Sequence, residues 1–249
     1  MELTIPRRFR GPPESGNGGW VSGALAEHVP TTTDRPAVSV RLASPPPLDR
    51  PLSIVLETTA TADTSGAGLP TVRLLDGDHL VATASAAPDL DDDVPPQVDI
   101  DSARAAETRF EGLADHPFPT CFACGTARDP DDALCLRPGP LDDGTGRYAA
   151  TWVPRDVSGP LVWASLDCPG GWSAGIAGRP MVLGTMTARV RALPSPGRVH
   201  VVMSWQRGSE GRKHHSGSAL YSPDGTVLAR AEATWIAVDP TSVRPKEPS

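Results

Sequence analysis

The 249-residue sequence lacks any run of about eighteen apolar residues, which excludes a transmembrane helix. Its first residues, MELTIPRRFRG, carry charge but no apolar segment follows them, so a secretory signal is not expected. Lysine is almost missing, since only Lys213 and Lys246 occur among 23 basic residues. The formal net charge of −7 argues against general nucleic-acid binding. We therefore expect a cytoplasmic protein without nucleic-acid or membrane partners.

Cysteine is also scarce, because Cys121, Cys124, Cys135 and Cys168 are too few for a disulfide scaffold of this length. The first two form a Cys-x-x-Cys in HPFPTCFACG, and a zinc site would need two further ligands, for which Cys135 and His116 are candidates. However, a second Cys-x-x-Cys is lacking and Cys135 lies in a segment typical of a strand. Reduced, buried cysteines are the preferred interpretation, and the sequence predicts no metal and no other cofactor.

The sequence repeats one pattern twice, at a separation of roughly 150 residues. Four matches occur in the same order in both halves: Gly11-Pro12 with Gly159-Pro160, Gly18-Gly19-Trp20 with Gly170-Gly171-Trp172, VRLASPPP from Val40 with VRALPSPG from Val190, and Asp76-Gly77 with Asp224-Gly225. Their order and nearly constant separation indicate a tandem duplication.

Each copy is predicted to have a short helix after the Gly-Gly-Trp motif, followed by strands. The strands are expected at 37–43, 52–62 and 71–87 in the first copy, and at 183–193, 198–208 and 216–238 in the second. Each Asp-Gly pair marks a hairpin turn. Further strands are expected in ALCLRPG and GRYAATWVP, and a helix in SARAAETRFEGL.

These patterns divide the chain into four parts. We expect a first repeat over 1–90, an acidic, Pro-rich linker with a helix and the Cys-x-x-Cys over 91–130, a second repeat over 131–240, and a disordered tail over 241–249.

One helix wrapped by an antiparallel sheet, twice in one chain, resembles the double-hotdog fold, an α+β architecture. The helix start GNGGWVSGALA resembles that of bacterial thioesterase-like proteins related to the acyl-CoA thioesterases. The second half, with CFACG, LDCPGGW and ALYSPDGTVLARAEATWI, resembles uncharacterised actinobacterial members of that superfamily. The resemblance implies an acyl-CoA or carrier-bound thioester as substrate, and a carboxylate near the helix.

Thioester hydrolysis needs a polarised carbonyl, and the N-terminus of a helix supplies unpaired N–H groups for this. Glycine allows close approach, so Gly18, Gly19, Gly170 and Gly171 are candidate substrate-binding and oxyanion-stabilising residues. Tight helix packing explains these glycines equally well. Trp20 and Trp172 stand beside them as candidate binding residues, although a core role is favoured for both tryptophans.

The residues before the two Gly-Gly pairs differ between the copies. Asp167 is the candidate general base or nucleophile, and Asn17 the candidate for polarising the carbonyl or orienting water. Each is also a good cap for its own helix. Cys168 invites assignment as a nucleophile, but no histidine is adjacent to it in sequence, so packing is preferred.

A basic loop, GSEGRKHHSGSAL, provides Arg212 and Lys213 as candidates for binding the phosphates of CoA. Its histidines, His214 and His215, are candidates for titration near neutral pH. A solvated hairpin loop is the alternative interpretation.

The sequence therefore predicts an acyl-CoA thioesterase. The alternatives are a non-catalytic acyl-CoA or lipid-binding protein on the same fold and, with less support, a hydratase or dehydratase, for which no histidine precedes either Gly-Gly pair. Two hotdog copies in one chain mimic the usual dimer, and further pairing into a homo-oligomer is compatible with the sequence.

Overall fold

The computed structural model describes residues 1–58, 70–91 and 93–240. The first half contains β1 (Glu2–Thr4), α1 (Gly18–Ala26), β2 (Ala37–Leu42), β3 (Pro51–Thr58), β4 (Pro70–Asp76) and β5 (His79–Ala87). The second half contains β6 (Gly139–Pro140), β7 (Tyr148–Trp152), α3 (Gly159–Ser173), β8 (Met181–Val190), β9 (His200–Glu210), β10 (Lys213–Tyr221) and β11 (Val227–Ala237). Helix α2 (Ile100–Glu107) lies between the halves, and single 3-10 turns occur at Arg7–Phe9 and Glu111–Leu113.

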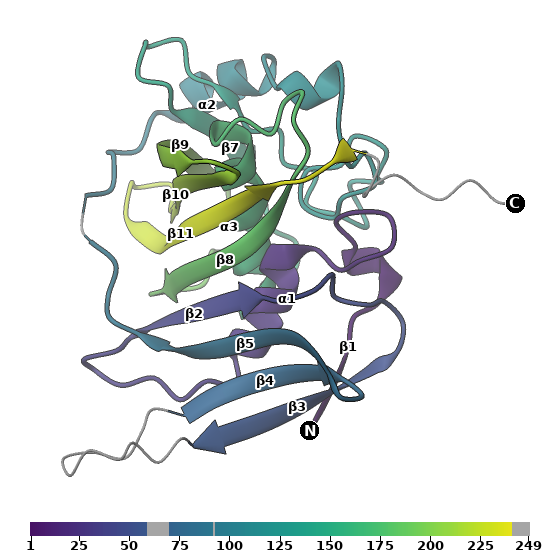
Figure 1. The fold of residues 1–249 in the computed structure, drawn as a ribbon. Helices are drawn as coiled ribbons and strands as arrows, with labels where there is room; N and C mark the ends of the chain where they lie inside the picture. The colour runs from purple at the N-terminus through teal and green to yellow at the C-terminus, as the bar shows by residue number, and fades with distance from the viewer. Residues whose placement is uncertain (59–69, 92, 241–249) are drawn as a thin grey trace, which may run out of the picture.

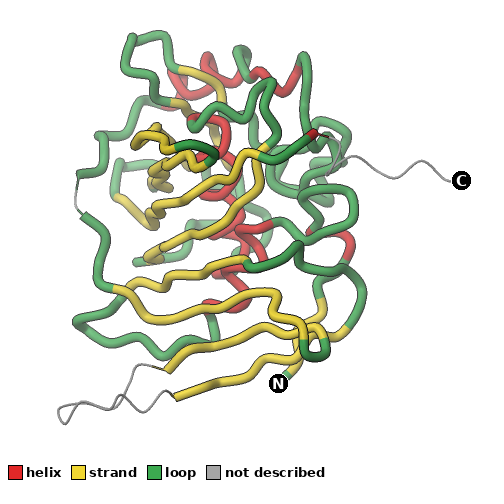
Figure 2. The backbone as a smooth tube through the Cα atoms, viewed as in Figure 1, coloured by secondary structure: helices red, strands yellow, loops and turns green. Residues whose placement is uncertain are grey.

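Within the described residues, eleven strands form one antiparallel sheet in the order β1-β3-β4-β5-β2-β8-β11-β10-β9-β7-β6. Figure 1 and Figure 2 show this sheet curving around α1 and α3. The order β3-β4-β5-β2 on one side is repeated in reverse as β8-β11-β10-β9 on the other, as expected for two copies of one unit related by a two-fold axis. The predicted tandem α+β architecture is confirmed.

The two halves join where β2 pairs with β8. Ser39 lies opposite Thr187, and the Thr187 hydroxyl donates a hydrogen bond of 2.9 Å to Ser39 Oγ. These residues are 148 positions apart, the same separation as that of the two Asp-Gly turns. The pairing makes the two sheets continuous, and one hydrophobic core extends through both halves.

Most predicted strands are confirmed, and Gly77 and Gly225 adopt positive φ in the two predicted hairpin turns. The prediction of a strand in ALCLRPG is wrong except at Gly139, because Cys135 takes a φ of 51°, which is incompatible with extended backbone. Part of the predicted strand at 52–62 and the predicted disordered tail at 241–249 lie outside the described residues.

The start of the second helix was predicted wrongly. Helix α3 begins at Gly159, where Ser158 Oγ accepts a hydrogen bond from the Leu161 N–H and Pro160 occupies the first turn. Gly170 and Gly171 therefore lie in its last turn rather than its first. Helix α3 extends further than α1 on the N-terminal side of the motif. The Gly-Gly-Trp motif therefore begins α1 but lies near the end of α3.

The acidic segment between the halves is attached to the second half. The buried guanidinium of Arg230, on β11, donates hydrogen bonds to the backbone oxygens of Leu90 and Asp91 and to the Asp89 carboxylate. Further along, α2 buries Ala103 and Ala106 against β7 and β9. The domain boundaries predicted from sequence remain a proposal.

No helix in the described part of the chain is both long enough and apolar enough to span a membrane.

Helices α1 and α3 cross at very short range, because glycines of α1 face α3. A Cβ added to Gly23 would lie 2.6 Å from Pro160 Cα and 2.8 Å from Trp163 Cβ. A Cβ added to Gly19 would lie 2.4 Å from Asp167 Cβ. Close packing against α3 therefore explains why α1 has glycine at positions 19 and 23.

We predict that Gly23→Ala lowers the free energy of unfolding by about 1–3 kcal/mol, since backbone of α3 must move to admit the methyl group. Gly159→Ala is the matched control, because its added Cβ would meet only the mobile end of the Glu27 side chain. Urea unfolding of both variants measures the difference. Equal stability would show that the crossing is not tightly packed.

Candidate functional site

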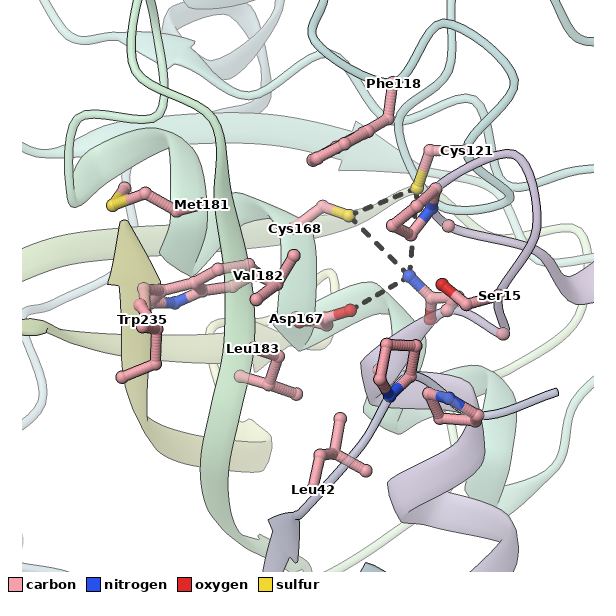
Figure 3. Close-up of a pocket in the computed structure, with 18 of the residues that line it drawn as sticks. Ser15, Leu42, Phe118, Cys121, Asp167, Cys168, Met181, Val182, Leu183 and Trp235 are labelled. Carbon is pink, nitrogen blue, oxygen red and sulfur yellow. Dashed lines mark hydrogen bonds between the residues drawn. The ribbon is translucent and has the colours of Figure 1, made fainter. Parts of the chain in front are cut away.

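A pocket of about 450 Å³ opens between the two halves, next to the N-terminus of α1. Its walls come from the loop before α1, from α3, from β8 and from the segment that joins the two halves (Figure 3). Apolar side chains form much of the lining: Leu42, Phe118, Ile176, Met181, Val182, Leu183, Trp235 and Ile236. Polar groups gather at one end, where Asn17, Asp167 and three cysteines meet.

Asn17 caps α1 and also links it to α3. Its Oδ1 accepts the Trp20 N–H at 2.8 Å, and its Nδ2 donates to Asp167 Oδ2 at 2.9 Å. The side chain is 2% exposed. Both ends of the amide therefore have protein partners, so Asn17 orients the neighbouring carboxylate.

Asp167 lies on α3, pointing toward the start of α1 (Figure 3). Its Oδ2 accepts hydrogen bonds from Asn17 Nδ2 and from the Gly19 N–H, both at 2.9 Å. Its Oδ1 is buried and has no hydrogen-bond partner among the described residues. Burial raises the pKa of Asp167 to about 7, against the opposing effect of the Gly19 hydrogen bond. Such a carboxyl can exchange protons near neutral pH.

The first residue of α1, Gly18, lines the pocket. In the described part of the chain no hydrogen bond uses its backbone N–H, whereas the N–H groups of Gly19 and Trp20 are occupied by Asp167 and Asn17. A free N–H at a helix start carries partial positive charge. Two residues that line the pocket, Gly18 and Asp167, thus each have one polar backbone or carboxylate atom without a hydrogen-bond partner in the described structure.

Three cysteine sulfurs converge beside this pair. The Sγ atoms of Cys121, Cys124 and Cys168 all lie within 4.8 Å of one another, and the Cys121 and Cys168 sulfurs are 3.5 Å apart. Asn17 Nδ2 lies 3.8 Å from the sulfurs of Cys121 and Cys168, and Trp172 Nε1 donates to Cys124 Sγ at 3.4 Å. Hydrogen bonds from the Cys124 and Cys168 side chains hold the pKa of Cys121 well below its usual range.

The partners suggested from sequence for the Cys-x-x-Cys pair do not join it. Cys135 directs its sulfur to the Arg128 carbonyl oxygen, 3.9 Å away. His116 lines the pocket, but its Nδ1 accepts the Phe118 N–H and its Nε2 contacts the Cys124 carbonyl oxygen, each at 3.0 Å. The third cysteine near this pair is Cys168. Its position next to Asp167 in the sequence was the one feature that could have indicated a place at the site.

Of the eight predicted substrate-binding residues, Gly18 lines the pocket and the other seven do not. In the last turn of α3, N–H groups bond within the helix, so Gly170 and Gly171 lack the free N–H groups of a helix start. A Cβ on Gly171 would lie 3.0 Å from the Trp235 ring, so this glycine serves packing. Trp20 stacks on Phe9 with ring centroids 4.1 Å apart, and Trp172 is fully buried.

Arg212 and Lys213 are exposed in the turn between β9 and β10 and do not line the pocket. Lys213 pairs in register with Ile236, a pocket residue, so the turn lies near one end of the pocket wall. Their role in binding CoA stays a prediction. His214 is 4% exposed, and both its ring nitrogens lack hydrogen-bond partners among the described residues.

A second hollow adjoins the pocket and shares Pro13, Glu14 and His116 with it. Three arginines, Arg7, Arg10 and Arg179, line this hollow together with Thr120, Glu14 and Asp115. Arg7 pairs with Glu14 at 2.8 Å. Arg10 Nε and Thr120 Oγ1 are buried and have no hydrogen-bond partner in the described residues. The sequence gives no local signal for this group, because its members are scattered along the chain.

Nearly all of the given sequence resembles several solved structures. A protein of unknown function with a hot dog fold, from Alicyclobacillus acidocaldarius, matches with a TM-score of 0.61 at 12% identity, over 96% of this chain and 92% of that one. The fold is a double hotdog. An acyl-CoA thioesterase II from Mycobacterium marinum matches this double hotdog with a TM-score of 0.57 at 11% identity, over 97% and 93% of the two chains.

The double hotdog also matches the dehydratase domain of a mycocerosic acid synthase-like PKS, with a TM-score of 0.61 at 12% identity, over 96% and 91% of the two chains. No protein-family model matches the sequence, and no curated protein matches it significantly. The similarities define the fold and leave the reaction to be inferred from the site.

We predict that Asn17→Ala destabilises the double hotdog more than Asn17→Ser does, by about 1 kcal/mol. Both variants lose the donor to Asp167, but a serine hydroxyl still accepts the Trp20 N–H. Thermal and urea unfolding measure the difference. Equal stabilities would mean that the cap is not what holds this end of α1.

Proposed function

We propose that the protein hydrolyses an acyl thioester, of CoA or of a carrier, in the pocket between its halves. The observation that carries this proposal is that Asp167, with an unpaired Oδ1, and Gly18, whose N–H has no hydrogen bond among the described residues, both line one largely apolar pocket. Acyl-CoA thioesterases among the structures with this fold support it. As part of the proposal we place the protein in the cytoplasm, where thiols such as those of its four cysteines stay reduced.

The acyl chain would lie against the apolar wall. Leu42, Met181, Val182 and Leu183 line the pocket from β2 and β8 (Figure 3). A volume of about 450 Å³ is within the range of pockets for small ligands. Burial of methylene groups there contributes about 0.8 kcal/mol for each group.

The thioester carbonyl would then reach the start of α1. Its oxygen accepts a hydrogen bond from the Gly18 N–H, which stabilises the negative charge that develops on this oxygen. Asp167 takes a proton from a water molecule through Oδ1, and the water oxygen attacks the carbonyl carbon. The carbon–sulfur bond breaks, and the proton passes from Asp167 to the departing thiolate. The step yields a carboxylic acid and a free thiol and needs no cofactor.

Asn17 is a positioning residue in this scheme. Its Nδ2 fixes Asp167 Oδ2, together with the Gly19 N–H, and this leaves the buried Oδ1 as the oxygen without a partner among the described residues. From sequence, Asn17 was predicted to act directly on the carbonyl or the water. The occupied amide favours action through Asp167 instead.

The arginine-lined hollow is the proposed site for the phosphates of CoA. Arg10 and Arg179 form no salt bridge within the described residues, and Arg10 Nε and Thr120 Oγ1 are buried atoms without a hydrogen-bond partner there. Arginine matches phosphate geometry with paired N–H donors. The shared wall lets one ligand extend from the hollow into the pocket.

A dehydratase has less support from this site. The resemblance implies an acid paired with a histidine for that chemistry, and His116 is the histidine that lines the pocket. Both ring nitrogens of His116 already contact backbone groups, so neither is free to move a substrate proton.

We predict that Asp167→Asn lowers the rate of acyl-CoA hydrolysis about 100-fold or more, because the amide cannot accept the proton of water. The substitution keeps the shape of the side chain, so the melting temperature should stay close to that of the parent. Asp34→Asn, on the exposed surface, is the matched control and should keep full activity.

The assay uses acyl-CoAs of graded chain length and detects the free thiol. Full activity in Asp167→Asn would remove this carboxylate from the mechanism. Tight binding of acyl-CoA by the parent protein, without release of thiol, would replace hydrolysis with a binding function.

We predict that Arg179→Ala and Arg10→Met each raise the KM for an acyl-CoA about tenfold, because each loses charge-assisted hydrogen bonds to phosphate. The same acyl group on N-acetylcysteamine, which has no phosphate, should show an unchanged KM. Arg212→Ala and Lys213→Ala are the controls. A larger rise in KM from these two variants would indicate that the phosphates bind at the turn between β9 and β10 instead.

A further inference from the structure

We propose that Cys121, Cys124 and Cys168 bind a zinc ion at the polar end of the pocket. The inference goes beyond thioester hydrolysis and does not depend on it. Two of the thiols come from the segment between the halves, and the third comes from α3. Their sulfurs lie within 4.8 Å of one another, with 3.5 Å between Cys121 and Cys168. Sulfurs on a tetrahedral zinc ion are about 3.8 Å apart, so small side-chain adjustments suffice.

The loop that carries Cys121 and Cys124 has a shape suited to metal binding. The Gly125 N–H donates to the Cys121 carbonyl oxygen at 2.9 Å. A Cβ on Gly125 would lie 2.5 Å from the carbonyl oxygens of both Cys121 and Pro119, so only glycine fits. The tight turn holds both thiols toward the same side.

N–H groups surround the sulfurs. The Trp172 indole donates to Cys124 Sγ, and the Asn17 amide lies 3.8 Å from the sulfurs of Cys121 and Cys168. Such donors stabilise negative charge on sulfur and orient thiolate ligands around a metal. A buried cluster of this kind suits a thiophilic ion better than it suits apolar packing.

The fourth position on the zinc ion would face the pocket. All three sulfurs are close to the polar end, and Cys121, Cys124 and Cys168 are among the pocket-lining residues. The His116 ring nitrogens are already used by backbone groups, so water from the pocket is the proposed fourth ligand. This is the arrangement of zinc sites that keep an open position.

The test measures zinc in untagged protein purified without chelator, by elemental analysis. We expect about one zinc ion per chain in the parent protein and in Cys135→Ser, whose thiol lies outside the cluster. Cys168→Ser should lose most of this zinc on dialysis. Metal-free parent protein that also fails to bind added zinc would overturn the inference, as would a Cys121–Cys168 disulfide in the purified protein.

Cobalt substitution gives a second readout that does not require a variant to fold. Co²⁺ added to the metal-free parent protein should produce the near-ultraviolet absorption of thiolate-to-cobalt charge transfer, with an intensity that indicates three sulfurs. Absence of this band would overturn the inference. Both measurements are made without substrate, so an inactive protein that holds zinc would refute the proposed hydrolysis and leave the metal site standing.

Discussion

The contact between Asp167 and the start of α1 is the constraint on which the rest of the site depends. The Gly19 N–H and the Asn17 amide both donate to the same carboxylate oxygen, at 2.9 Å. The contact needs helices close enough that α1 has glycine where it meets α3. It joins the two halves of the chain and leaves the other oxygen of Asp167 without a partner in the described structure. The same interaction thus fixes the helix crossing and sets up the chemistry.

The segment between the repeats completes the site. Phe110 and Phe118 are buried in the core that both halves share, and this places Cys121 and Cys124 opposite α3. Without that segment the pocket would have lost one wall. A region that composition describes as a linker is therefore part of the functional unit.

Repeats made the fold predictable from sequence. The Asp-Gly turns and the alternating apolar residues occur at local spacings, and such signals depend little on distant parts of the chain. The Gly-Gly-Trp match predicted a second helix that begins near Gly170, whereas α3 begins at Gly159, after its N-cap Ser158, and ends at Ser173. The shared motif indicated that the two helices are related, but it did not show that it lies at the start of one and at the end of the other.

The site was predictable only in part. Asn17 and Asp167 could be chosen because they differ between copies, yet their hydrogen bond joins residues 150 positions apart. The sulfur cluster combines a local Cys-x-x-Cys with Cys168, and the arginine-lined hollow joins residues 7 and 10 with residue 179. Such contacts follow from packing, which no local pattern encodes.

The position of the Asp167–Gly19 contact has a consequence for how such a protein can arise. Gly19 and Asp167 are 148 positions apart, as are Ser39 and Thr187 at the junction of the sheets, so both pairs lie where the two copies face each other. In a dimer of identical chains, each partner would present the same residue there. Two glycines would supply no carboxylate, and two aspartates would clash in a space that admits one side chain. Encoding both copies in a single chain lets them differ at their own axis of symmetry, which a dimer of identical chains cannot do.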